Sequence, residues 1–268
     1  MIKQNRPRIL ITNDDGVKSP GLLAAADAVS EISEVTIIAP LSQQTAMGRS
    51  QRGNPQAMLE ELTLTSDNRE YSAFACDASP ARVVGHGLKV MPDYTPDLVI
   101  SGINYGENLG NCITSSGTVG AAFESAVWGI PSIAISLETP IESHYEYSAQ
   151  KWDVAAYFLR YFVKQILSKG FPDGADVLKI DIPRDASRDC PWRVTKLSNN
   201  SYYRSNIKNP TLQSRISDAV VSKQKCAEEK PDTDVYALAV DRVVSVTPLS
   251  LDLTAYNSFS CLDKWEQG

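Results

Sequence analysis

Residues 8–39 have the sequence RILITNDDGVKSPGLLAAADAVSEISEVTIIA, and this pattern indicates the fold class more strongly than any other stretch. Residues 8–12 form a short apolar run that ends in the turn cluster 13–16, which predicts a buried strand. Ser19 is a suitable helix N-cap, Pro20 suits the first helical position, and apolar residues then recur with helical spacing. A second strand is predicted at 35–39. A strand, a helix and a strand in succession form a β-α-β unit, so we expect the two strands to be parallel.

The same alternation of strand and helix returns later in the chain. It predicts a doubly wound, mostly parallel α/β sheet of the Rossmann type. The predicted strands are 97–101, 131–137, 177–182 and 243–247, and the predicted helices are 117–128 and 151–169. Residues 59–75 resemble an inserted β-hairpin, whereas residues 199–233 are polar and have no clear period. We therefore expect a single domain over 1–268, in which 199–268 supply an oligomerisation arm and a closing strand.

Composition narrows the classes of function. The formal net charge is −6, which does not favour binding to a nucleic-acid duplex. The five cysteines are scattered and form no CxxC pair, which is typical of reduced thiols in the cytoplasm. The polar N-terminus does not resemble a signal peptide, and no apolar run approaches the roughly 20 residues of a membrane helix. The two histidines, His86 and His144, lie in no recognisable motif, so we expect them to be surface or packing residues.

Polar residues follow three of the predicted parallel strands. In an open parallel sheet, ligands bind beyond the carboxyl ends of the strands, so these loops should meet at one edge. Asp14 and Asp15 follow the first strand, Thr45 lies in the loop after the second, and Asn104 follows the strand at 97–101. Adjacent carboxylates raise each other's pKa unless a cation neutralises them, and Mg²⁺ and Mn²⁺ prefer oxygen ligands. The pattern predicts a site for one such cation, although an isolated Asp-Gly pair is more often an ordinary turn.

A second feature is the segment 115–122, SSGTVGAA, which leads into a predicted helix. The free amides at a helix N-terminus can bind phosphate, although an ordinary N-cap by Ser116 would explain the same sequence. Arg49, in the loop after the second strand, could offer a bidentate guanidinium to phosphate, but it could equally be a solvated loop residue. The candidate phosphate- or substrate-binding residues are Asn13, Gly48, Arg49, Asn108, Ser115, Ser116, Gly117 and Thr118.

Taken together, four stretches resemble the SurE family of stationary-phase survival proteins, which are metal-dependent 5′/3′-nucleotidases. The stretches are ITNDDG at 11–16 with Pro20-Gly21, Ala39-Pro40 with the polar loop to Ser50, SGINYGEN at 101–108 with SGTVGAA at 116–122, and SVTPL at 245–249 with Asp252-Leu253-Thr254. They occur in the family's order across nearly the whole chain.

The resemblance implies a phosphomonoesterase that acts on nucleoside 5′- and also 3′-monophosphates, with base and position preference left open. It implies that Asp14, Asp15 and Asn104 bind the metal and that Asp14 and Asp15 are the catalytic acids. The family usually has serine as the fourth ligand, and Thr45 occupies that position and keeps the hydroxyl. It also implies a homodimer or homotetramer that exchanges C-terminal arms.

The sequence departs from the family at two further positions. The family's Thr-Pro-Ala-Asp segment is Ser79-Pro80-Ala81-Arg82 here, and Ser115 replaces a tyrosine that often precedes Ser-Gly-Thr. These departures concern substrate preference more than the reaction.

Three other classes of protein share parts of the pattern. A haloacid-dehalogenase-type phosphatase needs a nucleophilic Asp two residues before Asp15, where this chain has Asn13. A receiver-like signalling domain needs a phosphorylatable Asp at a later strand end, and the strand at 97–101 leads into SGIN without one. A non-catalytic nucleotide-binding module remains an alternative, although it would not explain the paired acids.

Overall fold

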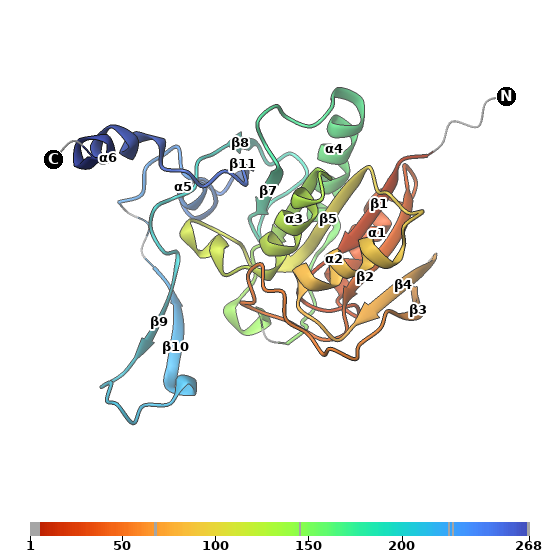
Figure 1. Ribbon diagram of the computed structural model, residues 1–268, viewed down its shortest axis with the longest axis horizontal. Coiled ribbons are helices and arrows are strands. Elements are labelled where there is room, and N and C mark those ends of the chain that lie inside the picture. Colours follow the sequence, from red (N-terminus) through yellow and green to blue (C-terminus); the bar gives the residue numbers. More distant parts are fainter. Residues whose placement is uncertain (1–5, 67–68, 145, 225, 227, 267–268) are drawn as a thin grey trace.

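The N-terminal β-α-β unit is present in the computed structural model, which describes residues 6–66, 69–144, 146–224, 226 and 228–266 (Figure 1). Strand β1 spans Arg8–Thr12, helix α1 spans Pro20–Val29 and strand β2 spans Glu34–Pro40. The two strands are parallel, with Ile9 opposite Val35. Ser19 occupies the N-cap position, but its side chain makes no capping hydrogen bond there. The prediction for this unit is confirmed.

In the described residues, nine strands form one mixed sheet in the order β3-β4-β2-β1-β5-β6-β7-β11-β8. The run from β4 to β7 is parallel, as the doubly wound prediction requires, while β3 and β11 each pair antiparallel with a neighbour. The remaining strands are β3 (Glu60–Thr65), β4 (Glu70–Cys76), β5 (Leu98–Tyr105), β6 (Ser132–Leu137), β7 (Val177–Ile182), β8 (Trp192–Val194) and β11 (Val244–Leu249).

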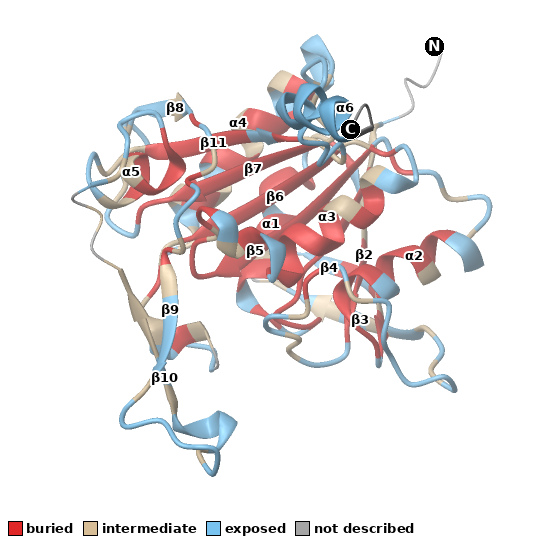
Figure 2. Ribbon diagram, turned by 60° about the vertical axis from the view of Figure 1, so that its left-hand side comes forward, coloured by how far each residue is buried: buried red, intermediate tan, exposed pale blue. Residues whose placement is uncertain are grey.

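Helices cover both faces of this sheet, and the buried residues lie between the layers (Figure 2). Ile9 and Ile11 of β1 pack with α1 and with α4 (Asp153–Lys169), whereas Leu10 packs with α2 (Pro80–Val90) and α3 (Gly117–Val127). Neighbouring residues of a strand point to opposite faces, which explains this division.

Helix α2 was not predicted from the sequence. Gly85 and Gly87 lower its intrinsic helix propensity. In the folded chain, however, a Cβ at Gly87 would lie 2.8 Å from Ile38 and one at Gly85 would lie 3.0 Å from Glu124. The two glycines therefore let α2 pack closely against β2 and α3, and tertiary packing outweighs propensity.

The C-terminal third consists of parts that project and parts that join the main sheet. Strands β9 (Tyr203–Ile207) and β10 (Ala219–Lys223) form a separate antiparallel hairpin that projects from the body, and α6 (Phe259–Glu266) stands away from the sheet (Figure 1). Between them, α5 (Asp234–Ala239) and β11 pack into the body. Short 3₁₀ turns occupy Asn111–Thr114, Ile141–His144, Ile216–Asp218 and Tyr256–Ser258. No helix in the described part of the chain is long and apolar enough to cross a membrane.

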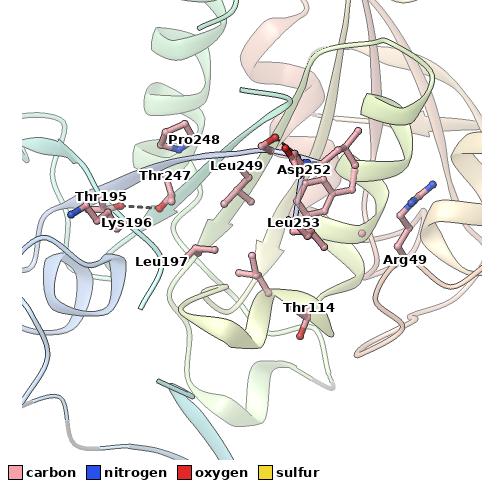
Figure 3. A pocket seen from close by; sticks show the side chains of 15 residues that line it. Arg49, Thr114, Thr195, Lys196, Leu197, Thr247, Pro248, Leu249, Asp252 and Leu253 are labelled. Atoms are coloured by element: carbon pink, nitrogen blue, oxygen red, sulfur yellow. Dashed lines mark hydrogen bonds between the residues drawn. The ribbon is translucent and has the colours of Figure 1, made fainter. Parts of the chain in front are cut away.

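A groove of about 640 Å³ lies where β11 and the tail after it pass beside α3 and the 3₁₀ turn at Asn111–Thr114 (Figure 3). Its walls are largely apolar and include Ile113, Phe123, Leu249 and Leu253, while Arg49 lies at one end. Every residue from 252 to 265 is exposed. This groove, which we call the tail groove, is therefore next to a C-terminal segment that does not bury its own apolar side chains.

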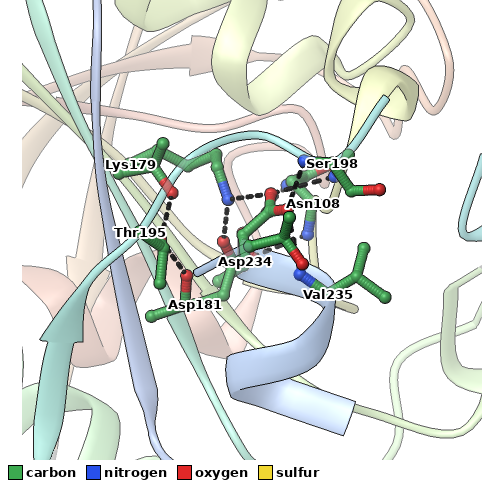
Figure 4. A network of polar contacts seen from close by, with 12 residues as sticks. Asn108, Lys179, Asp181, Thr195, Ser198, Asp234 and Val235 are labelled. Carbon is green, nitrogen blue, oxygen red and sulfur yellow. Dashed lines mark hydrogen bonds and ion pairs between the residues drawn. The ribbon is translucent and has the colours of Figure 1, made fainter. Parts of the chain in front are cut away.

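A buried ion cluster joins β7, α5 and the loop after β5 (Figure 4). Lys179 is fully buried, and its Nζ lies 2.5 Å from Oδ2 of Asp181 and 3.1 Å from Oδ2 of Asp234. The other carboxylate contacts are backbone amides: Asn108 donates to Asp181 (2.7 Å), and Gly110, Ser198 and Val235 each donate to Asp234 (2.9 Å). The charges and the polar backbone therefore satisfy one another inside the protein.

We expect Lys179→Met to lower the free energy of unfolding by about 3–5 kcal/mol, because it leaves two buried carboxylates without their cation. Urea unfolding followed by circular dichroism measures this change. Lys196→Met is the matched control, because Lys196 also pairs with an aspartate, Asp232, but its side chain is 79% exposed. The control should leave the unfolding midpoint nearly unchanged. Equal effects of the two substitutions would contradict the role given to the cluster.

Candidate functional site

A cavity of about 350 Å³ lies beyond the carboxyl ends of β1, β2 and β5. Asp14, Asp15, Thr45 and Asn104 all line it, so the three loops that carry them meet as the parallel sheet requires. The helix N-terminus at Ser116 and the base of the β9–β10 hairpin complete its wall. We call this space the acidic cavity.

Asp14 is buried, with only 6% of the residue exposed, and neighbouring groups hold its carboxylate from several sides. The Thr118 hydroxyl donates to its Oδ1 (2.5 Å), and a Cβ at Gly117 would come within 2.6 Å of the Asp14 Cβ. Glycine is therefore required for the start of α3 to approach this carboxylate so closely. Burial raises the pKa of Asp14 to about 6, although hydrogen bonds from Thr118 and Gly117 oppose the rise.

Asp15 lies beside it and is 3% exposed. The Tyr105 amide donates to its Oδ2 (3.1 Å), and the Gln43 side chain donates to its Oδ1 (3.3 Å). Burial, followed by the charge of Asp14, raises the pKa of Asp15 well above its usual range. Two buried carboxylates at a cavity wall, with no basic side chain bonded to them in the described residues, fit a bound cation that would neutralise both.

Asn104 reaches the acidic cavity through an irregularity of β5. The sequence predicts a loop from Gly102, but the strand continues to Tyr105 with a shift in its pairing to β6: Ser101 pairs with Ala134 and Asn104 with Ser136. One extra residue on β5 makes a β-bulge, a feature that redirects side chains next to active sites. Gly102 has φ +131° here, a conformation that favours glycine. The Asn104 side-chain nitrogen donates to the Gly106 carbonyl (2.6 Å), which leaves its Oδ1 available to bind a cation.

Thr45 is exposed, in the loop after β2. Its hydroxyl makes one long contact, 3.5 Å, with the carbonyl of His144. Ser42 and Ser50, the other hydroxyls of this loop, do not line the acidic cavity. Together with two carboxylates and one amide, the Thr45 hydroxyl makes an all-oxygen donor set. No group of three His, Cys, Asp or Glu side chains that could hold a metal ion occurs in the described residues.

The predicted substrate-binding residues divide by position. Asn108, Ser115 and Ser116 line the acidic cavity. Gly117 and Thr118 lie behind the wall, where they contact Asp14. Gly48 is also behind it, and its amide donates to the Ser115 carbonyl (2.8 Å).

Two of those residues are placed elsewhere. Asn13 is fully buried, and both ends of its amide bond to the backbone of Gly16 (3.0 and 3.1 Å), so it shapes the turn that carries Asp14 and Asp15. Arg49 bonds to Glu124 (2.9 Å) and faces the tail groove. Neither residue lines the acidic cavity.

Several residues of the cavity wall were not predicted as site residues, among them Glu107, His144, Tyr203 and Arg204. Glu107 lies between Asn104 and Asn108 in the sequence, and this position could have marked it as a candidate site residue. Burial lowers the pKa of His144, so its imidazole is neutral near pH 7. No local pattern marks His144, Tyr203 or Arg204, because distant segments bring them to the site. Arg82, the noted departure on α2, is exposed and does not line the cavity.

Comparisons with known proteins agree with this arrangement. The family model described as "Survival protein SurE" matches residues 9–204. The chain is 37% identical over 261 residues to a Thermococcus gammatolerans protein named 5′-nucleotidase SurE, covering 95% of this chain and 94% of the relative. A Methanocella arvoryzae protein of the same name is 40% identical over 256 residues, covering 92% and 93%.

The crystal structure of the SurE protein from Aquifex aeolicus superposes with a TM-score of 0.76 at 29% identity, covering 97% of this chain and all of that one. The fold, the order of the motifs and the near-complete coverage lead to the same conclusion. This chain belongs to the SurE family.

Proposed function

We propose that this protein is a divalent-cation-dependent phosphomonoesterase that hydrolyses nucleoside 5′-monophosphates, with 3′-monophosphates as further candidate substrates. The observation that supports this proposal most strongly is that three separate loops bring four oxygen-bearing side chains to the wall of the acidic cavity: Asp14, Asp15, Thr45 and Asn104. The name 5′-nucleotidase SurE, borne by relatives that align over almost the whole chain, supports the choice of substrate.

One Mg²⁺ or Mn²⁺ per subunit would be held by these four residues, because their donors are all oxygen atoms. When bound, such an ion supplies positive charge against the phosphoryl oxygens and lowers the pKa of water. The chain keeps the two acids in place: the Thr118 hydroxyl orients Asp14, and the Tyr105 amide orients Asp15.

The rest of the reaction uses residues of the same wall. A water oxygen attacks phosphorus, the bond from phosphorus to the ribose oxygen breaks, and Asp14 or Asp15 accepts the proton of the water. The ribose oxygen leaves with a proton from solvent, so the products are the nucleoside and inorganic phosphate. Asn108, Ser115 and Ser116 line the same cavity, and in this proposal they border the phosphoryl group. A phospho-aspartyl route is disfavoured, because position 13 is an asparagine whose amide is bonded to Gly16.

The first test is hydrolysis of AMP and of p-nitrophenyl phosphate by protein treated with EDTA and then given Mg²⁺, Mn²⁺ or Zn²⁺. We expect activity to return with Mg²⁺ or Mn²⁺, and Asp15→Asn to lose several powers of ten in kcat without unfolding. Asp173→Asn, at an exposed turn, is the matched control and should keep full activity. Metal-independent turnover, or near-normal turnover by Asp15→Asn, would refute the proposal, and binding of AMP without turnover would favour a non-catalytic module.

Thr45 can be tested by its hydroxyl alone. Thr45→Val keeps the shape and removes the ligand oxygen, so it should raise the Mn²⁺ concentration needed for half-maximal activity roughly tenfold, the effect of about 1.4 kcal/mol. Thr45→Ser keeps the oxygen and should match or improve on wild-type metal demand. Titration calorimetry of Mn²⁺ binding gives the same comparison without turnover. Unchanged metal affinity in Thr45→Val would show that Thr45 is not a ligand.

We also propose a homodimer or homotetramer, in the cytoplasm, where its free cysteines would stay reduced. The support for assembly is the exposed tail: Phe259, Leu262 and Trp265 on α6 are all exposed, and Trp265 is 74% exposed. Apolar side chains gathered on a projecting helix mark an interaction surface. The apolar tail groove of a second copy is a fitting receptor for this segment.

Light scattering coupled to size-exclusion chromatography tests this assembly. Wild-type protein should elute as a dimer or tetramer, and the double variant Leu262→Glu, Trp265→Glu should shift toward the monomer mass, because it places charge on the buried contact. Val90→Glu alters an apolar residue on α2 that is 50% exposed, close to the 47% of Leu262, and should leave the mass unchanged. A monomeric wild-type protein, or an unchanged mass in the double variant, would contradict the tail's role.

A further inference from the structure

The charge of the acidic cavity poses a problem for an anionic substrate. Its described wall carries three carboxylates, Asp14, Asp15 and Glu107, and Arg204 is the one Lys or Arg among them. A phosphate monoester brings about two negative charges near pH 7. A cation held by Asp14 and Asp15 would offset those two acids, which leaves little positive charge for the phosphate itself. Some residue of the wall has to supply it.

Arg204 lines both the acidic cavity and an adjoining pocket of about 600 Å³, because the base of the β9–β10 hairpin is anchored between them. Lys223 Nζ lies 2.6 Å from Oε1 of the buried Glu107, which neutralises this third carboxylate. Lys223 pairs across the hairpin with Tyr203, and the Tyr203 ring packs edge-on against His144 with centroids 5.7 Å apart. Arg204 is the next residue along β9. Its backbone position is therefore set by contacts to the loop that carries the site.

The Arg204 side chain is exposed and forms no ion pair or hydrogen bond within the part of the chain that the structure describes. Other arginines differ: Arg49 pairs with Glu124 and Arg242 pairs with Glu138. A guanidinium without a carboxylate partner keeps its planar set of donors free for a phosphate group. Two other donors of the wall are less available, since the Asn108 side-chain nitrogen already donates to Ser136 (2.8 Å) and the Ser115 hydroxyl to the Cys112 carbonyl (2.9 Å).

We propose that Arg204 binds the phosphate group of the nucleotide substrate, so that the β9–β10 hairpin supplies a substrate-binding residue to the site. This inference rests on the proposed phosphomonoesterase function. It assigns to Arg204 the phosphate contact that the sequence suggested for Arg49. The cavity volume, about 350 Å³, is in the range of small-molecule sites and leaves room for a nucleoside monophosphate beneath the hairpin base.

The test compares Arg204→Gln and Arg204→Lys with wild-type protein for AMP hydrolysis, for inhibition by inorganic phosphate, and for inhibition by adenosine. Arg204→Gln should raise the KM for AMP and the inhibition constant of phosphate by roughly 10- to 100-fold, as for loss of a charged hydrogen bond. Arg204→Lys should recover part of this loss, while the adenosine inhibition constant and the calorimetric affinity for Mn²⁺ stay at wild-type values. Lys208→Gln is the matched control, because it removes one positive charge from the same hairpin outside the cavity.

Each outcome bears on the inference. An unchanged phosphate inhibition constant in Arg204→Gln would overturn it, and so would weaker binding of adenosine with phosphate unaffected, which would assign Arg204 to the nucleoside. An equal loss in Lys208→Gln would reduce the effect to general electrostatic attraction and also overturn it. Failure of the proposed function is distinguishable, because wild-type protein with Mg²⁺ or Mn²⁺ would then not hydrolyse AMP.

Discussion

A single buried amine links the body of this protein to its site. Lys179 in β7 lies between the carboxylates of Asp181 and Asp234. These carboxylates also accept hydrogen bonds from the backbone amides of Asn108, Gly110 and Ser198. The cluster therefore joins the central sheet, the loop after β5 and the segment leading to the hairpin. Buried charges are tolerated only when all of them are paired, so these segments have one arrangement in which none is left unpaired.

The acidic cavity inherits its geometry from that arrangement. The cluster holds the amide of Asn108, Asn104 lies four residues earlier on β5, and Glu107 between them receives Lys223 from the hairpin. On the other side, Thr118 and Gly117 at the start of α3 hold Asp14. The acids thus sit between rigid elements, which is what a preorganised site needs.

Hydrophobic periodicity in the sequence predicted the N-terminal β-α-β unit and the other parallel strands. The rule that ligands bind at the carboxyl ends of parallel strands predicted that the loops carrying Asp14, Asp15, Thr45 and Asn104 would meet. Helix α2 was not predicted, because Gly85 and Gly87 serve packing rather than propensity. The β9–β10 hairpin was not predicted either, because strand β9 (Tyr203–Ile207) is largely exposed and shows no buried face. The contributions of His144 and Arg204 depend on contacts between distant segments, which no local pattern records.

The extra residue in β5 sets a limit on how this chain can vary in length. Ser101 pairs with Ala134 and Asn104 with Ser136, so deleting one of the two residues between them would make the pairing regular and remove the bulge, while Asn104 would keep its partner on β6. The sheet could still form, but β5 would lose the irregularity through which Asn104 reaches the acidic cavity. Insertions and deletions can therefore accumulate at exposed turns, such as that near Asp173, but at this point of the sheet a change of one residue would separate folding from activity.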